Sequence, residues 1–200
     1  MFYEPRNFMA HYSDGESMKL LSGAFLLFTV AGITVLAADT GRPSMAHMYD
    51  RQLSMVEREV VSLAEAMPSD KYEFAPSAGD FKGVRTFGQQ MSHIATVIYE
   101  VSAGVLGEKS PVDSGKSENG PETLKTKEAI VKYLKEAFAY GHKAMSSLTD
   151  QNFTELVASP FGDKSPRGSL ANITLWHTFD HYGQAVVYAR MNRIVPPASR

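Results

Sequence analysis

Hydrophobic residues recur at helical spacing in four long segments of this chain. The segments are 44–67, 86–106, a third that begins near Thr126, and 170–191. In each of them apolar residues return every three or four positions, which is the period of one helix face. No segment shows the strict alternation of apolar and polar residues that is typical of a strand. The pattern predicts an all-α protein, a four-helix bundle.

Local signals support the helix boundaries. Ser44 is a plausible N-cap of the first helix, and the sequence Thr86-Phe-Gly-Gln89 has the spacing of a capping box at the start of the second. The connection 68–85 contains aromatic residues and is predicted to pack on the bundle end. The connection 107–122 is rich in Gly, Ser and Pro and is predicted to be mobile. A short helix is predicted at 150–157.

Three histidines are candidate metal ligands. His93 lies on the second predicted helix, and His177 and His181 lie on the fourth, where their i, i+4 spacing places both imidazoles on one face. If the two helices pack side by side, three neutral imidazoles converge and leave a coordination position open, as a catalytic metal site requires. Taken alone, an HxxxH pair arises by chance in long helices, and a lone histidine at position 93 is more often a hydrogen-bonded boundary residue.

The sequence around these histidines resembles the DinB family, also called the DinB/YfiT-like metalloproteins. One matching stretch, LAEAMPSDKYEFAPSAGDFKGVRTFGQQMSHIA at 63–95, contains His93 near its end. The other, SPFGDKSPRGSLANITLWHTFDHYGQAVVYARMNRIVPPAS at 159–199, contains the family's HxxxHxGQ signature, from His177 to Gln184. The resemblance covers roughly residues 45–199.

This resemblance implies a fold and a type of chemistry. It implies that His93, His177 and His181 are the metal ligands, and that the four helices follow an up-down-down-up arrangement. Characterised relatives include S-transferases that use bacterial low-molecular-weight thiols, and thiol-dependent isomerases. A metal-dependent reaction of that type is therefore one expectation for this chain.

Composition excludes several other classes of function. The 200 residues, 44% of them hydrophobic, suffice for one domain with its own core. The absence of cysteine excludes disulfides, thiolate ligands and a cysteine nucleophile. A net charge of −2 with mixed signs gives no electrostatic basis for binding nucleic acid. Sequence motifs of nucleotide-binding loops, serine hydrolases and zincins are also absent.

The N-terminal region has the character of an export signal. Residues 20–38 form an uncharged apolar run that follows Lys19 and ends in small residues. We interpret Met18 as the natural start, residues 1–38 as an extension plus a secretory signal peptide, and residues 39–200 as the bundle domain. The protein is then exported, to the periplasm or the medium. A retained membrane anchor is the alternative, because 19 apolar residues approach the span of a bilayer.

Residues near the candidate ligands have more than one interpretation. Asp180, one turn from His177, either accepts the second N–H of a ligand imidazole or is simply solvated. Gln184 belongs to the signature, and Glu100 either faces the site or is solvated. For two further sets of residues we predict a structural role and no part in the chemistry. The core or the cavity wall is predicted to contain Trp176, Tyr182 and Tyr188, while Val187 and Met191 are predicted to supply apolar contacts of the fourth helix. The surface is predicted to contain His47 and His142.

Two functions fit these observations. The first is a metal-dependent hydrolase or transferase of unknown small-molecule substrate, in which the divalent ion is zinc, nickel or iron. The predicted export favours hydrolysis by metal-bound hydroxide over thiol transfer, because the thiol cofactors are cytoplasmic. The second is an exported, non-catalytic bundle that binds a metal or a small ligand, as a monomer or a homodimer.

Overall fold

The computed structural model describes residues 41–115 and 117–200. The chain divides into two units, Met1–Thr40 and Gly41–Arg200, and the description below concerns the second. The predicted extension, signal peptide and cleavage point lie outside the described residues. Within the described part, no helix combines the length and the apolar character needed to cross a membrane.

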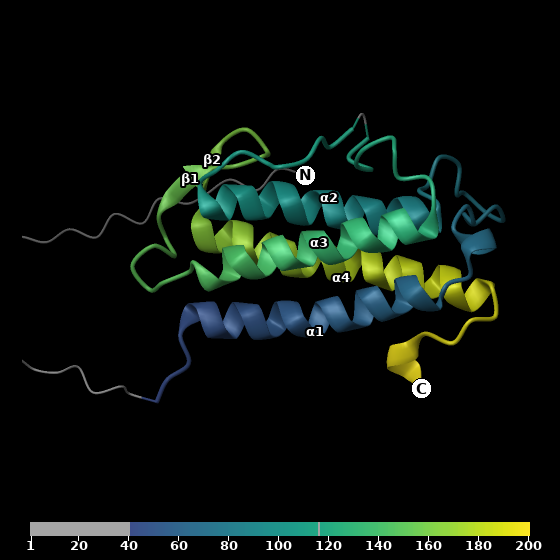
Figure 1. The fold of residues 1–200 in the computed structure, drawn as a ribbon, viewed down its shortest axis with the longest axis horizontal. Coiled ribbons are helices and arrows are strands. Elements are labelled where there is room, and N and C mark those ends of the chain that lie inside the picture. Colours follow the sequence, from purple (N-terminus) through teal and green to yellow (C-terminus); the bar gives the residue numbers. More distant parts are fainter. Residues whose placement is uncertain (1–40, 116) are drawn as a thin grey trace, which may run out of the picture. The chain divides into compact units, whose positions relative to one another are not determined.

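Four long helices form the bundle, which confirms the predicted all-α fold (Figure 1). They are α1 (Met45–Ala66), α2 (Phe87–Leu106), α3 (Lys127–Ser146) and α4 (Arg167–Met191). Short 3₁₀ turns, η1 (Ser69–Lys71) and η2 (Pro197–Ser199), follow α1 and α4.

Side-chain caps fix the starts of the first three helices. The Ser44 hydroxyl accepts a hydrogen bond from the backbone N–H of His47. Thr86 and Gln89 form the complete capping box at the start of α2. The Thr126 hydroxyl likewise accepts from the backbone N–H of the third residue of α3. Each cap satisfies a backbone donor that the first helical turn cannot pair, so helix starts are readable from the sequence at these three places.

The helices follow the up-down-down-up arrangement. In Figure 1, α1 and α4 run in one direction and α2 and α3 run in the other. Both α1 and α2 pack against α3 and α4, so α1 and α2 lie diagonally opposite each other. Because α2 and α3 are parallel, their connection must return along the length of a helix of about 30 Å. This geometry explains why the connection between residues 106 and 127 is long.

The inward faces of the helices make one continuous core. Its largest fully buried side chains include Phe87 of α2 and Phe138 of α3. The connection 68–85 packs on this core, as predicted: the Tyr72 hydroxyl donates to the Ala64 carbonyl at 2.6 Å, and the Tyr72 ring meets that of Phe87 at 5.3 Å between centroids. The start of α2 is thereby fastened to the end of α1.

The short helix predicted at 150–157 is wrong: residues 150–154 form turns, and a β-hairpin begins at Leu156. Strand β1 (Leu156–Ala158) pairs antiparallel with β2 (Lys164–Pro166). Each strand has three residues, too few for an alternating pattern to be recognised. The hairpin leads directly into α4, which therefore begins at Arg167, three residues before the predicted position.

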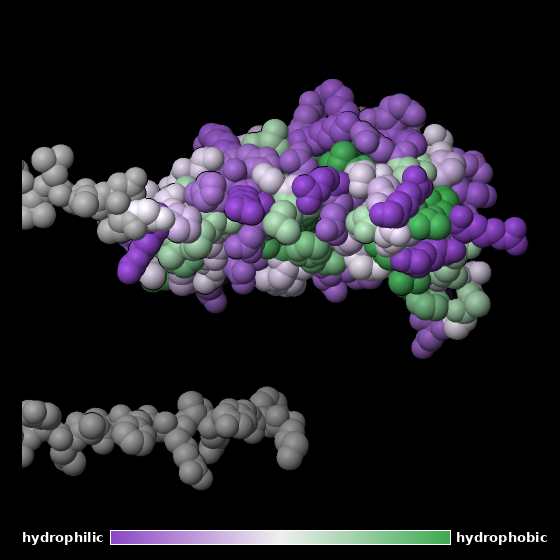
Figure 2. Space-filling model, turned by 90° about the horizontal axis from the view of Figure 1, so that it is seen from below, coloured by the Kyte–Doolittle hydropathy of each residue, from purple (hydrophilic) through white to green (hydrophobic). Residues whose placement is uncertain are grey.

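The outer face of α4 corrects a second prediction. Trp176 is 54% exposed, and Val187 and Met191 are also exposed, so these three do not belong to the core. Tyr182 and Tyr188 are buried, as predicted. α4 thus carries large apolar side chains on both its inner and its outer face. Figure 2 shows one face of the molecule, which is largely hydrophilic and is interrupted by separate hydrophobic areas.

His142 was predicted to be a surface residue. It is instead half-buried and links α3 to α1. Its Nδ1 lies 2.6 Å from a carboxylate oxygen of Asp50, and its Nε2 lies 3.0 Å from one of Glu57. Only the protonated imidazolium can donate from both nitrogens at once. Burial lowers the pKa of His142, but the hydrogen bonds that its ring donates to the two carboxylates outweigh burial and leave the pKa raised.

This link predicts a pH-dependent contribution to stability. The folded pKa of His142 lies above the unfolded value, so the stabilisation is fully present below about pH 6.5 and is lost as the pH rises through the folded pKa. We expect His142→Gln to lower the free energy of unfolding more at pH 6 than at pH 9. The expected difference is about 1 kcal/mol or less, because both carboxylates are partly exposed. Urea unfolding at the two pH values measures it.

The matched control is His47→Gln, since His47 is exposed at the start of α1. Its effect on the free energy of unfolding is expected to be the same at both pH values. An effect of His142→Gln that stays constant or grows towards pH 9 contradicts the assigned ion pair.

Candidate metal centre

The structure brings the three predicted histidines together. His93 comes from α2, and His177 and His181 come from successive turns of the neighbouring α4. Each ring contributes one nitrogen to a group of three atoms that all lie within 4.8 Å of one another. Their ring centroids are separated by 4.5 to 5.0 Å. The i, i+4 pair therefore meets the third histidine across the α2–α4 contact, as the spacing predicted.

The proton of His93 is placed by a backbone carbonyl. His93 is only 3% exposed, and its Nδ1 lies 2.8 Å from the carbonyl oxygen of Glu118. A carbonyl oxygen only accepts, so Nδ1 carries the proton and the neutral ring presents an unprotonated Nε2. This is the form in which an imidazole binds a metal ion.

Glu118 belongs to a segment that lies along α2, here called the strap (residues 113–115 and 117–120). The Ser114 hydroxyl donates to the Glu100 carboxylate, and Asn119 accepts from the Arg85 guanidinium at 2.8 Å. The connection was predicted to be mobile, which stays a prediction; in the structure these hydrogen bonds join the strap to α2 and to Arg85. The strap therefore carries the Glu118 carbonyl to His93.

The backbone of the strap requires unusual conformations. Glu118 has a φ of 54°, in the left-handed region that side chains disfavour. Gly120 has a φ of 76°, and a Cβ there would lie 2.9 Å from Oγ1 of Thr96. At Gly115 a Cβ would lie 2.4 Å from the carbonyl oxygen of Gly120. Glycine at 120 thus allows the strap to lie close to α2, and glycine at 115 allows the two ends of the strap to approach each other.

A chain of amides orients His181. Its Nδ1 lies 2.6 Å from Oε1 of Gln90, whose Nε2 donates to Oε1 of Gln184 at 3.1 Å. Nε2 of Gln184 in turn donates to a carboxylate oxygen of Asp180 at 3.1 Å. Because a carboxylate accepts, Asp180 fixes the orientation of both amides, and Gln90 presents its oxygen to His181. Nδ1 of His181 is therefore the donor, and its Nε2 is free for a ligand.

His177 provides the test of whether a metal fits. Its Nδ1 is buried and has no hydrogen-bond partner among the described residues. A buried imidazole nitrogen without a partner is unfavourable, and a cation bound at Nδ1 would provide the missing partner. Together with the free Nε2 atoms of His93 and His181, this donor set fits a divalent ion.

Burial keeps all three rings neutral. It lowers the pKa of His93, and it lowers the pKa of His177 to about 3 and that of His181 to about 4. The neighbouring histidines and the positive charge of Arg85 act in the same direction on His177. At neutral pH the imidazoles are in the unprotonated state that metal binding requires.

Comparison with known families agrees with this geometry. Residues 52–185 match the model of the DinB superfamily. The chain belongs to the DinB superfamily. A search of curated proteins gave no match.

Solved structures show the same fold for this DinB-superfamily protein. A crystal structure of a DinB-like protein from Bacillus cereus is 20% identical, with a TM-score of 0.58, and the match covers 74% of this chain and 93% of the other. A DinB-like protein from Bacillus subtilis is 19% identical, with a TM-score of 0.55 and coverage of 73% and 92%. At these identities the likeness shows the fold alone.

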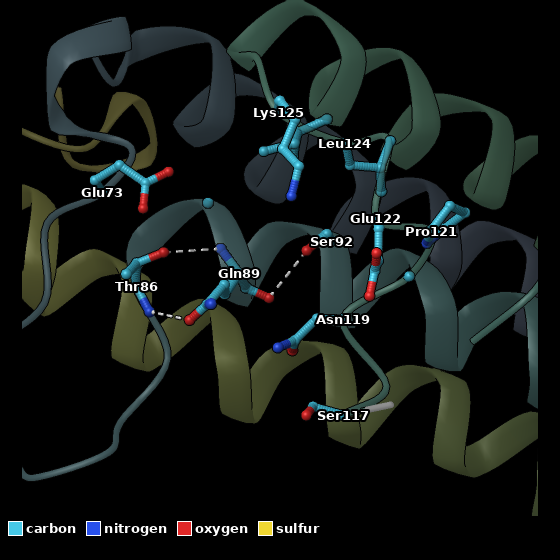
Figure 3. Close-up of a pocket in the computed structure, with 13 residues that line it drawn as sticks. Glu73, Thr86, Gln89, Ser92, Ser117, Asn119, Pro121, Glu122, Leu124 and Lys125 are labelled. Atoms are coloured by element: carbon cyan, nitrogen blue, oxygen red, sulfur yellow. Dashed lines mark hydrogen bonds between the residues drawn. The ribbon is translucent and has the colours of Figure 1, made fainter. Parts of the chain in front are cut away.

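Two cavities lie beside the centre of this DinB-superfamily protein. One, of about 470 Å³, lies between the start of α2, the strap and α4, and Arg85, Gln90 and Gln184 line it. The other, of about 290 Å³, lies between the first turns of α2 and residues 117–125. Figure 3 shows that its wall contains the carboxylates of Glu73 and Glu122 and the ammonium group of Lys125.

The remaining sequence predictions about this site have mixed outcomes. Asp180 does not accept directly from a ligand imidazole but reaches His181 through two amides. Gln184 lies in that chain, which agrees with its place in the signature. Glu100 is not simply solvated, since its carboxylate accepts a hydrogen bond from Ser114 of the strap.

Sequence reasoning missed Gln90 and the Glu118 carbonyl. Gln90 lies three residues before His93 on the same helix, so its position one turn away was a usable signal. The Glu118 carbonyl gave none, because a backbone atom leaves no trace in the side-chain pattern.

Proposed function

We propose that this protein binds one divalent metal ion through His93, His177 and His181 and is a metal-dependent hydrolase or transferase of a small molecule. The observation that carries the proposal is the convergence of three neutral imidazoles, two of which have their outer nitrogens bonded to acceptors. Three neutral ligands leave the charge of the ion uncompensated. A divalent ion in such a site supplies a Lewis acid with an open position, which acidifies a bound water or thiol or polarises a substrate oxygen.

The surrounding residues support this role by fixing the ligands. The strap holds the tautomer of His93, and Gln90 holds that of His181. Such outer contacts orient the imidazoles and maintain their basicity towards the ion. Imidazole ligands suit zinc, nickel and iron alike, so the chemistry of the donors favours a divalent transition metal without selecting one.

Hydrolysis is the favoured reaction within this proposal. The predicted export would separate the protein from cytoplasmic thiol cofactors, whereas water is available in every compartment. The competing proposal is an exported bundle that holds a metal or a small ligand without turnover.

We expect the purified protein to carry about one divalent ion per chain, as measured by inductively coupled plasma mass spectrometry after gel filtration. A chelator should remove the ion, and zinc, nickel or iron(II) should restore it. Ester, amide and phosphoester substrates, screened before and after chelation, then separate the two proposals. Turnover that disappears with the chelator supports the hydrolase; full metal content without turnover supports the non-catalytic bundle. A protein that stays metal-free after all three additions contradicts the hydrolase and leaves only a bundle that binds a small ligand without metal.

A further inference from the structure

The larger cavity beside the centre is lined by groups that favour an anion. The cavity, of about 470 Å³, is lined by Arg85, by the amides of Gln89, Gln90 and Gln184, and by Ser117 and Asn119 of the strap. No aspartate or glutamate is among its lining residues in the described part of the chain. The smaller cavity in Figure 3 differs in this respect, because carboxylates and an ammonium group lie in its wall together.

Arg85 supplies a positive charge that no acid of the described chain neutralises. Its Nε donates to Oδ1 of Asn119 at 2.8 Å, and its Nη2 donates to the carbonyl of Ser117 at 3.1 Å. Both acceptors are neutral. Among the described residues Arg85 forms no ion pair, and its Nη1 has no hydrogen-bond partner. A half-buried guanidinium held in place by neutral acceptors retains the capacity to bind an oxyanion through its remaining N–H groups.

The cavity and the three histidines are parts of one electrostatic unit. Gln90 lines the cavity and also bonds to His181, while Ser117 and Asn119 flank the residue that bonds to His93. The charge of Arg85 acts on all three rings and lowers the pKa of each. A divalent ion bound by the histidines would add to this positive charge. In the amide chain, the negative charge that opposes it is the carboxylate of Asp180.

We propose that this cavity binds the oxyanion of the ligand of the metal centre, a carboxylate or phosphate group on a small molecule, and that Arg85 determines this specificity. The inference rests on the proposed metal function and names the substrate class of the same site. Arg85 binds the anionic group, and the neutral amides around it accommodate the polar part of the molecule.

The test measures binding rather than turnover. Calorimetric titrations of the zinc-loaded and the metal-free protein use succinate and inorganic phosphate as probes, with succinamide as the uncharged analogue of succinate. We expect Arg85→Gln to weaken binding of both anions by about 10- to 100-fold, the range for hydrogen bonds to a charged group. Metal content is expected to stay at the wild-type value, and succinamide is expected to bind weakly and equally to both proteins. The succinate and phosphate arms show which oxyanion the cavity prefers.

Two variants separate anion binding from a structural role. Arg58→Gln, on the exposed face of α1, should have no effect. Arg85→Lys keeps the charge without the planar fork and should lie between wild type and Arg85→Gln. If Arg85→Gln does not fold, the comparison of Arg85→Lys with wild type carries the test.

The outcomes are distinct from those of the proposed function. Equal anion affinity in Arg85→Gln and wild type overturns this inference and leaves the metal proposal intact, as does an Arg85→Lys variant that loses as much affinity as Arg85→Gln. Absence of anion binding to the wild-type protein overturns it as well. Absence of metal overturns the proposed function, and the metal-free titrations then still report whether Arg85 binds the oxyanion.

Discussion

Replacing His177 by alanine is expected to remove nearly all metal from the purified protein. His177 is one of the two proposed ligands on α4, and the remaining pair, His93 and His181, would leave the ion with only two protein ligands. Structural zinc sites with four ligands have apparent binding free energies of about 10–16 kcal/mol, so the loss of one ligand should weaken affinity by at least about 100-fold. The same result is expected for His93→Ala and His181→Ala. Metal per chain after gel filtration measures the effect.

The control for this experiment is His47→Ala, because His47 is exposed at the start of α1 and far from the centre in sequence. It should retain about one ion per chain. Circular dichroism should show that each of the three ligand variants keeps its helices, since the core of the bundle does not depend on these rings. Wild-type stoichiometry in the three ligand variants would show that the ion binds elsewhere.

The helices could be predicted because their signals are local. Ser44, Thr86 and Thr126 each cap a helix start, and the apolar stripes behind them are long enough to define the period. The start of α4 has no such signal: Pro166 stands at its N-cap position and makes no side-chain bond there. That start is set by the hairpin before it, so it was predicted less well.

The prediction for Trp176 failed for a related reason. The α4 helix has apolar residues around most of its circumference, so periodicity does not say which side faces the core. Packing against α2 and α1 decides that Tyr182 is buried and Trp176 is exposed. Only tertiary structure contains that information.

The histidines could be predicted and their supports could not. His177 and His181 are joined by helix geometry, and the resemblance to the family implied His93 as the third ligand. Their outer contacts join residues that are far apart, as Gln90 and His181 are, or involve a backbone carbonyl, as at Glu118. Such contacts depend on how α2, α4 and the strap pack, which a single sequence does not specify.

The contact between Gln90 and His181 leads to the second large expected effect. Gln90→Ala removes the acceptor that fixes the His181 ring, while all three ligands remain. Outer contacts of this kind typically change metal affinity by about 10- to 100-fold, and we expect a loss in that range. The affinity is measured by competition with a chromogenic chelator.

Two further variants test the reason for that loss. Gln90→Glu replaces the amide oxygen with a carboxylate that can still accept from Nδ1 of His181, so it should restore the affinity or raise it above the wild-type value. Gln52→Ala, on the exposed face of α1, should leave the affinity unchanged. If Gln90→Ala and Gln90→Glu weaken binding equally, the amide acts through the packing of α2 against α4 and not through the orientation of His181. If neither changes the affinity, His181 is held by the rigidity of α4 alone.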